Sequence, residues 1–332
     1  MDAHYTRHVE GRNLHKPPTF VVPGFAEDAS SFEKFANDLS HNNHNVFVTE
    51  HPRGKDERQQ ARERIDATID QAREWYKQNR PDIDPVHLEA LFASLPQSLL
   101  EEAMFFIRII EEEVKTTRKE PVEVVGHSQG AFTVVLAAFL RPDLFPNQEN
   151  AQSTLLLMNP AGFTGREGIA ESKALQAIGK VKESKEAKAR EMVDDSWRTL
   201  KIMVDYSISQ IASFIFRGNT KEAFKQMNEA DKKAAGYVAR NFLNGRIFQE
   251  GSDIANTDIV PFLEVVNGNG VRLAVMSDEK DSLFRSEKIE KRVSGLDYIE
   301  LYKTDGEGHF LPVRAAKKAS DKTHDILTRS GG

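Results

Sequence analysis

The sequence predicts an α/β protein built on a mainly parallel sheet of about six strands, with helices on both faces. Three observations support this fold class. Segments with the character of strands lie near residues 18–23, 45–49, 122–126, 153–158, 271–276 and 297–303. Helical segments separate these strands, and chains that alternate strands with helices form parallel sheets. One strand also passes into its helix through a Gly-x-Ser-x-Gly turn, which leaves a serine at the end of the strand.

The first strand runs into a turn, and the second is followed by a distinct loop. Residues 19–22 lead into Pro23, Gly24 and Phe25, where proline stiffens the backbone and glycine permits a close approach. A simple Pro-Gly turn between strand and helix is the alternative interpretation. The second strand is followed by His-Pro-Arg-Gly at residues 51–54.

A helical insertion, residues 56–97, precedes the third strand. It consists of a charged helix to about Gln78, a break at residues 79–82 and a second short helix. A further helix begins at Leu99. Its apolar residues recur at steps of three and four and so predict a face packed on the sheet; they are Leu99, Ala103, Phe106, Ile110 and Val114.

The third strand carries the most informative motif, Gly-His-Ser-Gln-Gly at residues 126–130. Such a strand reverses into its helix so sharply that the backbone of Ser128 is strained, and Gly126 and Gly130 prevent steric collision. The Ser128 hydroxyl is then exposed at the end of the strand. The backbone N–H of Gln129 points toward whatever that hydroxyl attacks. An ordinary glycine-rich turn is the alternative.

Acidic residues and a histidine follow the last two strands. Residues 271–276 are followed by Ser-Asp-Glu-Lys-Asp at residues 277–281, and residues 298–302 by Asp-Gly-Glu-Gly-His at residues 305–309. Together with the serine turn, this order resembles the α/β-hydrolase family, in which nucleophile, acid and histidine follow one another along the chain. The resemblance covers most of residues 18–326.

The resemblance also bears on how the sheet begins. Only about seventeen residues precede the first strand, too few for the two antiparallel strands that often open the family's sheet. We therefore expect a shortened sheet. The Arg-Gly pair at residues 53–54 resembles a loop of the family at the same place, which supports the register.

His309 fits the histidine of the family's triad. Among the ten histidines it alone follows a late strand and lies in a glycine-flanked loop that could reach Ser128. His127 adjoins Ser128 and is expected to point away from it. The others lie in polar segments, where we expect solvated side chains: His4, His8, His15, His41, His44, His51, His87 and His324.

The resemblance assigns the acid to Asp281, which aligns with the aspartate of the family's Gly-x-x-Asp pattern. Asp278 replaces the usual glycine of that pattern, so it is the reserve candidate, with Glu279 behind it. Some members carry the acid one strand earlier, but Asn159 offers only an amide there. We therefore expect Asp281 to hold the imidazole of His309 in the correct tautomer.

The resemblance further implies an oxyanion hole. The first strand ends where relatives carry a His-Gly-x loop whose third residue donates an N–H to the oxyanion. By position that residue is Phe25, and Gln129 supplies the second amide. Gly24 lets the backbone approach closely.

A long insertion, residues 163–260, lies where many relatives carry a helical cap. Residues 1–162 and 261–332 then form the core. Apolar residues of the insertion recur at steps of three and four, and this pattern predicts packing between cap and core. The alternative is that they also line an apolar pocket for the acyl chain. These residues are Leu200, Met203, Val204, Ile208, Ile211 and Ile215. Phe25, Phe163 and Phe214 are candidates for binding the substrate.

Composition restricts the class of protein. The 332 residues include no cysteine, which excludes disulfides, cysteine-ligated zinc and thiolate catalysis. The net charge of −6 is unclustered and gives no indication of a nucleic-acid partner. The polar N-terminal segment carries no secretory signal, and no apolar run approaches the roughly 20 residues of a membrane span, so we expect a cytoplasmic protein. No metal or organic cofactor is expected, and the oligomeric state is left open.

These expectations imply a serine hydrolase that cleaves carboxylic esters of small to medium acyl chains, or lactones, whose opening is the same acyl transfer. Hydrolysis of C–C bonds or thioesters by the same triad, which capped family members also perform, is the alternative. Haloalkane dehalogenation is disfavoured because those enzymes need an aspartate where this chain has Ser128. The non-enzymatic alternative is a ligand receptor that retains the hydrolase fold.

Overall fold

The computed structural model describes most of the predicted core. The residues it describes are 5–9, 17–24, 27, 29–52, 55–116, 120–148, 151–163, 253–254, 257–281, 284–305 and 308–329. The chain divides into two compact units, one of Met1–Phe25, Ala29–Thr164 and Thr257–Gly332, the other of Ala26–Asp28 and Gly165–Asn256. Phe25, Phe214 and the apolar stripe of the expected cap lie outside the described residues, so those expectations stay predictions.

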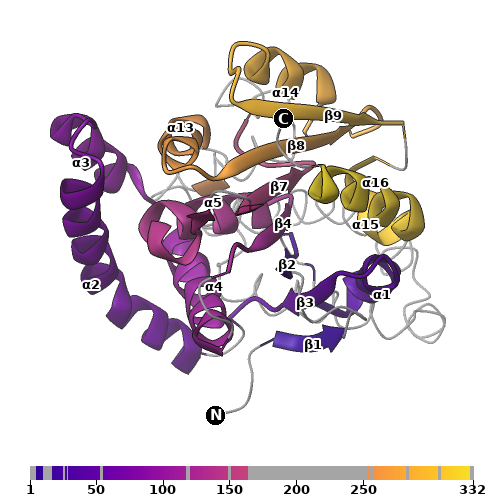
Figure 1. Ribbon diagram of the computed structural model, residues 1–332, viewed down its shortest axis with the longest axis horizontal. Helices are drawn as coiled ribbons and strands as arrows, with labels where there is room; N and C mark the ends of the chain where they lie inside the picture. The colour runs from indigo at the N-terminus through magenta and orange to yellow at the C-terminus, as the bar shows by residue number, and fades with distance from the viewer. Residues whose placement is uncertain are drawn as a thin grey trace, which may run out of the picture. The chain divides into compact units, whose positions relative to one another are not determined.

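A twisted sheet forms the centre of the first unit (Figure 1). In the described part of the chain it has seven strands in the order β1-β3-β2-β4-β7-β8-β9. Their bounds are Tyr5–Val9 for β1, Pro18–Val22 for β2, Asn45–Thr49 for β3, Glu123–His127 for β4, Thr154–Met158 for β7, Arg272–Asp278 for β8 and Ile299–Thr304 for β9. All neighbours from β3 to β9 pair in parallel, which confirms the six predicted strands.

The sequence did not predict β1. This strand pairs antiparallel with β3 alone, at the edge of the sheet, and reads Tyr-Thr-Arg-His-Val. Tyr, Thr and Val favour strands, but a segment of only five residues depends on the partner strand that it meets in the folded chain. A separate small hairpin joins β5 (Asn147–Gln148) to β6 (Ala151–Gln152).

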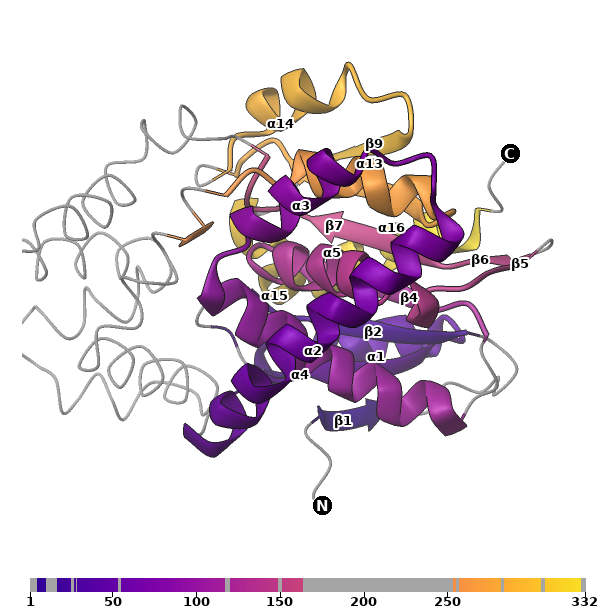
Figure 2. The same cartoon turned by 90° about the vertical axis from the view of Figure 1, so that its left-hand side faces the viewer.

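Helices cover both faces of the sheet. On one face α1, α15 and α16 pack together, and on the other α4, α5 and α13 do so (Figure 1). Figure 2 shows α2 and α3 on the outer side of α4 and α5. The α-helices span Glu33–His41 (α1), Lys55–Asn79 (α2), Pro85–Ser94 (α3), Gln97–Thr116 (α4), Gly130–Leu140 (α5), Val260–Gly268 (α13), Ser286–Val293 (α14), Leu311–Arg314 (α15) and Ala316–Thr328 (α16), and the 3₁₀ turns Ala29–Phe32 (η1), Pro142–Leu144 (η2) and Gly308–Phe310 (η3).

The predicted insertion before the third strand folds as α2 and α3. The break between these helices follows Asn79, and Asp84 caps α3 by accepting a hydrogen bond from the backbone N–H of Val86 at 2.9 Å. The predicted face of α4 is buried at Leu99, Ala103, Phe106 and Ile110, while the side chain of Val114 lies outside the description. The apolar period therefore located the packed face of α4 correctly.

Strand register brings the carboxyl ends of the central strands to one edge of the sheet. His127 pairs with Met158, Met158 with Met276, and Asp278 with Thr304. The residues that directly follow β4 and β7 therefore emerge side by side with the end of β8. In open parallel sheets this edge is where ligands bind.

Candidate active site

Ser128 occupies the sharp turn between β4 and α5. Its φ of 53° lies in the left-handed region, which a non-glycine residue adopts only under constraint. Two contacts impose this conformation: the Ser128 N–H donates to the carbonyl of Met158 at 3.0 Å, and its carbonyl accepts from the N–H of Ala161 at 3.1 Å. The backbone of Ser128 is therefore held against the carboxyl end of β7, and its hydroxyl projects from the turn.

The glycines on either side of the serine make this turn possible. A Cβ on Gly130 would lie 2.3 Å from the carbonyl oxygen of Val22, and one on Gly126 would lie 2.7 Å from the carbonyl oxygen of Gly130. Both obstacles are backbone atoms that cannot move aside cheaply. The sequence requirement for Gly-x-Ser-x-Gly is thus a steric one in this chain.

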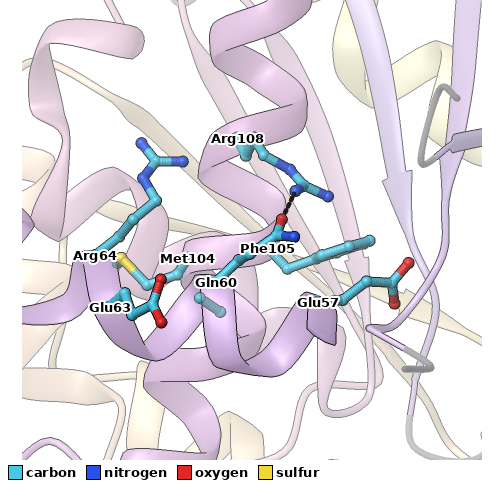
Figure 3. A pocket seen from close by; sticks show the side chains of 8 residues that line it. Glu57, Gln60, Glu63, Arg64, Met104, Phe105 and Arg108 are labelled. Atoms are coloured by element: carbon cyan, nitrogen blue, oxygen red, sulfur yellow. Dashed lines mark hydrogen bonds between the residues drawn. The ribbon is translucent and has the colours of Figure 1, made fainter. Parts of the chain in front are cut away.

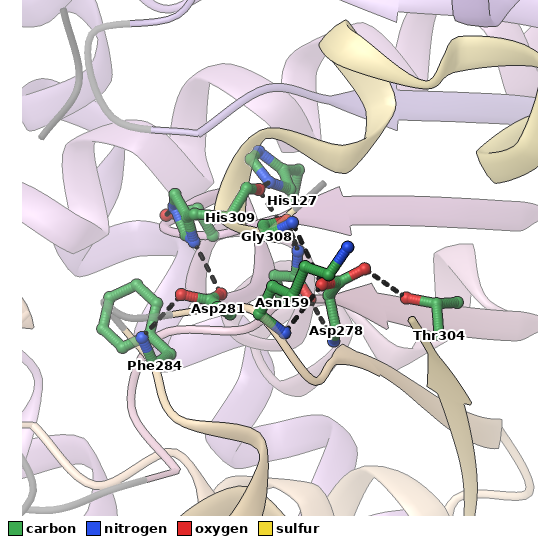
Figure 4. A network of polar contacts seen from close by, with 10 residues as sticks. His127, Asn159, Asp278, Asp281, Phe284, Thr304, Gly308 and His309 are labelled. Atoms are coloured by element: carbon green, nitrogen blue, oxygen red, sulfur yellow. Dashed lines mark hydrogen bonds and ion pairs between the residues drawn. The ribbon is translucent and has the colours of Figure 1, made fainter. Parts of the chain in front are cut away.

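The structure brings Ser128, His309 and Asp281 together in a hydrogen-bonded chain. His309 Nε2 lies 2.9 Å from the Ser128 hydroxyl, and His309 Nδ1 lies 2.8 Å from Asp281 Oδ2. Figure 4 shows the contact between His309 and Asp281. A carboxylate only accepts, so Nδ1 carries the proton and Nε2 is left to accept from the serine hydroxyl. All three side chains are buried.

Backbone contacts hold Asp281 in place. Its Oδ1 accepts a hydrogen bond from the N–H of Phe284 at 2.9 Å, and its own N–H donates to the carbonyl of Asp278 at 2.9 Å. The ring of Phe284 lies against the imidazole of His309, with 5.3 Å between ring centroids. The carboxylate is therefore positioned for His309 before any ligand binds.

Asp278, the reserve candidate for the acid, is engaged elsewhere. Its Oδ1 accepts from the N–H of Lys280 and from the N–H of Gly308, both at 3.0 Å, and its Oδ2 accepts from the Thr304 hydroxyl at 2.7 Å. These bonds direct the carboxylate at the loop that carries His309. Asp278 thus ties the ends of β8 and β9 to that loop (Figure 4).

Two residues of the site were not recognised from the sequence, Asn159 and His127. Asn159 is buried, has a φ of 45°, and accepts from the N–H of Asp278 at 2.8 Å. Its Nδ2 donates to the carbonyls of Gly308 at 3.1 Å and His309 at 3.2 Å. His127 Nε2 donates to the same His309 carbonyl at 2.7 Å. Only their position in the sequence could have indicated a role in the site, because both residues lie at the carboxyl ends of adjacent central strands.

Comparison with known proteins identifies the fold. No family model and no curated protein sequence matches this chain. Many solved structures resemble it, and three of them match across nearly their whole length as follows. A hydrolase from Oleispira antarctica gives a TM-score of 0.57 at 12% identity, with 98% of this chain and 96% of that chain covered. The α/β hydrolase MGS-M2 from a Medee basin deep-sea metagenome library gives 0.56 at 13% identity, with 97% and 93% covered. An esterase from Exiguobacterium antarcticum gives 0.51 at 13% identity, with 98% of each chain covered.

The chain has the α/β-hydrolase fold. In this α/β-hydrolase fold, Ser128 follows the central strand β4, Asp281 follows β8 and His309 follows β9. Serine, aspartate and histidine thus follow one another in the order in which this fold carries the nucleophile, acid and histidine of a triad.

The candidate oxyanion and substrate residues of the α/β-hydrolase fold are described only in part. Gln129 is buried at the start of α5, directly after Ser128. Phe163 is also buried, and its predicted contact with substrate stays a prediction. Phe25 lies outside the described residues, but the carbonyl of Gly24, which precedes it, accepts a hydrogen bond from His51 Nε2 at 2.8 Å.

His44 and His51 correct an expectation about the histidines. Both were expected to be solvated, yet His44 is 1% exposed and His51 is 6% exposed. His44 Nδ1 lies 2.9 Å from Glu123 Oε2, and His44 Nε2 lies 3.0 Å from His324 Nδ1. Polar neighbours in sequence did not indicate exposure here, because partners from distant elements satisfy these rings inside the fold.

A cavity of about 270 Å³ is lined by residues of α2 and α4. Figure 3 shows the side chains that line it, among them Glu57 and Arg64 of α2 and Phe105 and Arg108 of α4. The Arg108 guanidinium lies over the Phe105 ring, 5.2 Å from its centroid, and donates to Gln60 at 3.0 Å. None of the residues of the serine–histidine–aspartate chain lines this cavity.

Among the described residues, no group of three histidine, aspartate or glutamate side chains is placed to hold a metal ion. In the same part of the chain, no single helix combines the length and apolar composition of a membrane span, although α3 and α4, bent by 99°, meet both criteria when taken together.

Proposed function

We propose that this protein is a serine hydrolase that cleaves carboxylic esters of small to medium acyl chains, including cyclic esters. The observation that carries the proposal is the contact of the Ser128 hydroxyl with His309 Nε2 at 2.9 Å, while Asp281 accepts from the opposite ring nitrogen at 2.8 Å. A hydroxyl becomes a nucleophile when a neighbouring base takes its proton, and this geometry provides both the base and the group that orients it.

The reaction follows from these contacts. The Ser128 oxygen attacks the ester carbonyl while its proton passes to His309, and Asp281 stabilises the imidazolium that forms. The tetrahedral intermediate collapses as His309 returns the proton to the leaving alcohol, which leaves an acyl group on Ser128. Water then attacks the acyl group with His309 again as base, and the carboxylic acid departs. A lactone follows the same course with its alcohol still tethered to the acyl chain.

The developing oxyanion requires hydrogen-bond donors that are fixed in advance. The amides of Gln129 and Phe25 are the proposed donors. Gln129 follows the nucleophile at the amino end of α5, where backbone N–H groups lack partners within the helix. Each such donor lowers the barrier by roughly 3 kcal/mol in enzymes where one has been removed.

The choice of ester among possible substrates rests on the fold and the serine. Relatives in structure include a protein described as an esterase, and Ser128 suits acyl transfer to oxygen. Activity should rise with acyl length before it falls if an apolar pocket binds the chain, since each buried CH₂ contributes about 0.8 kcal/mol.

The test is initial-rate hydrolysis of p-nitrophenyl esters of graded chain length and of one acyl-homoserine lactone, with wild type and Ser128→Ala in parallel. We expect wild-type turnover that falls by about 10⁴-fold or more in the variant. The preferred substrate then separates esterase from lactonase. Tight binding of an ester with negligible turnover by wild type would overturn the proposal in favour of a receptor, and turnover of C–C substrates alone would replace the substrate class.

A further inference from the structure

We propose that His51 and Glu102 are a buried positioning pair that aims the oxyanion-hole amide following Gly24. The proposal rests on the proposed function, because it assigns a role in the same acyl transfer. It concerns residues outside the chain of Ser128, His309 and Asp281. Neither His51 nor Glu102 was a candidate on sequence grounds.

The sheet itself brings His51 to the first turn. Strands β2 and β3 run parallel as neighbours, with Val21 opposite Val48. Continuing that register by three residues on each strand places Gly24 opposite His51. The structure shows the resulting contact: His51 Nε2 lies 2.8 Å from the carbonyl oxygen of Gly24.

Glu102 completes the pair from the other side. It lies on α4 and is 2% exposed, and its Oε2 is 2.9 Å from His51 Nδ1, whose side chain is 6% exposed. A carboxylate removed from water in this way is costly unless a partner compensates it. The histidine is that partner, and it is fixed at both of its nitrogens.

Both ring nitrogens of His51 face oxygen acceptors. A neutral imidazole has a single N–H, so it cannot donate to Gly24 and to a Glu102 carboxylate at once. The two hydrogen bonds are satisfied when the pair holds one additional proton, either as imidazolium with carboxylate or with the proton on Glu102. The Nε2–H is present in both arrangements and donates to the carbonyl of Gly24.

Holding this carbonyl also determines where the next amide points. The C=O of Gly24 and the N–H that follows it belong to one planar peptide unit, in which a trans bond directs the two groups in opposite directions. A donor fixed on the oxygen therefore fixes the direction of the nitrogen. Withdrawing electron density through the carbonyl also polarises the N–H and strengthens it as a donor.

The same helix provides a matched control. Glu101 precedes Glu102, is 3% exposed, and directs its carboxylate to Arg62 of α2 at 2.6 Å. It is a buried carboxylate of α4 with a basic partner, as Glu102 is. Glu101→Gln therefore reports the cost of losing a buried charge on α4, separately from any effect on the oxyanion hole.

The experiment compares wild type, Glu102→Gln, His51→Ala and Glu101→Gln. For each we would measure kcat, KM, the melting temperature, and the affinity for an alkylboronic acid matched to the best acyl chain. The boronate forms a tetrahedral adduct on the serine, so it reports binding to the oxyanion hole. The Kd of the ester itself is measured with the same substitutions in a Ser128→Ala background.

We expect His51→Ala to lower kcat and boronate affinity in parallel by about 10- to 100-fold, below the loss seen when an oxyanion donor is deleted outright. The ester Kd should change by less than about threefold, because the amide that follows Gly24 binds the carbonyl of the bound ester only weakly before the reaction. Glu102→Gln should lose less, since its amide can donate to Nδ1 and leave the Nε2–H in place. A variant that combines His51→Ala with Glu102→Gln should lose no more activity than His51→Ala alone.

Two results would overturn the inference. One is that His51→Ala and Glu102→Gln melt at lower temperature, as we expect of Glu101→Gln, yet keep the wild-type kcat and boronate affinity. The other is a loss confined to KM. Failure of the proposed function is recognised differently: wild type itself would neither turn over esters nor bind the boronate.

Discussion

The side-chain amide of Asn159 donates to the carbonyl oxygen of His309 at 3.2 Å, so the end of β7 holds the loop that carries the proposed base. His127, at the end of β4, donates to the same carbonyl. The imidazole is thus oriented by Asp281 through its ring and by two neighbouring strands through its backbone. Interactions of this kind determine whether a triad keeps the geometry that reaction requires.

Asn159→Asp should impair catalysis more than folding. The substitution replaces the Nδ2 donor with an oxygen that faces the carbonyls of Gly308 and His309, so we expect kcat to fall by about 10- to 100-fold with KM little changed. Stability should fall by about 1–3 kcal/mol. Ester kinetics and urea unfolding check both values.

Asn159→Gly is the control for that variant. Glycine accepts the φ of 45° without strain but makes none of the side-chain hydrogen bonds. We expect it to lose activity also. Full activity in Asn159→Gly would show that the amide does not position His309.

Asp278, the last residue of β8, and Asp281, which follows the strand, should differ in what they support. Asp281→Asn removes the carboxylate that orients His309, and we expect kcat to fall by about 10⁴-fold with the fold intact. Asp278→Asn weakens hydrogen bonds to Lys280, Thr304 and Gly308, so its main effect should be a loss of about 2 kcal/mol in the free energy of unfolding. Kinetics and denaturation of both variants decide the assignment, and a larger kinetic loss in Asp278→Asn would reverse it.

Gly130→Ala should be strongly destabilising. Its methyl group would lie 2.3 Å from the Val22 carbonyl oxygen, and the backbone of β2 would have to shift, at a cost of about 3 kcal/mol or more. Gly295→Ala is a control because its Cβ would meet nothing within 4 Å, and it should stay within about 0.5 kcal/mol of wild type. Thermal melts of the two variants compare them directly, and equal melting temperatures would refute the steric argument.

Stability should depend on pH through Glu300. Arg272 hydrogen-bonds both carboxylate oxygens of Glu300 at 2.6 Å and lowers the pKa of that carboxyl below its ordinary value of 4.5. The unfolded chain therefore takes up the proton first as the pH falls. The contribution of this pair is present above pH 4.5 and is lost as the pH falls through the lower, folded-state pKa.

Glu300→Gln isolates that contribution. The carboxylate is partly exposed, so we expect the variant to be less stable than wild type by no more than about 1 kcal/mol at pH 7. The difference should shrink as the pH is lowered below 4.5. Urea unfolding of both proteins across this range measures it, and a difference that grows on acidification would contradict the assigned direction of the pKa.

Much of the core could be predicted because its signals are local. The apolar runs gave the six parallel strands, and the period of α4 gave its buried face. The Gly-x-Ser-x-Gly turn and the residues after the last strands were enough to propose Ser128, Asp281 and His309, which the structure brings within hydrogen-bonding distance.

What the sequence did not indicate depends on register and on distant partners. The contacts of Asn159 with the His309 loop exist because the register of β4, β7 and β8 brings their carboxyl ends to the same edge of the sheet. His51 was expected to be solvated because its neighbours in sequence are polar, whereas Glu102, fifty-one residues away, satisfies it inside the fold. β1 pairs with β3, which lies about forty residues further along the chain. No local pattern records such pairings.

We expect His309 to make Ser128 a nucleophile, and reaction with a fluorophosphonate probe measures that nucleophilicity. The measurement is the rate of covalent labelling in wild type and in His309→Ala, with the modified peptide located by mass spectrometry. We expect a single adduct on Ser128 in wild type and a labelling rate lower by several orders of magnitude in the variant. Absence of labelling in wild type, or labelling of Ser128 at the same rate without His309, would contradict this expectation.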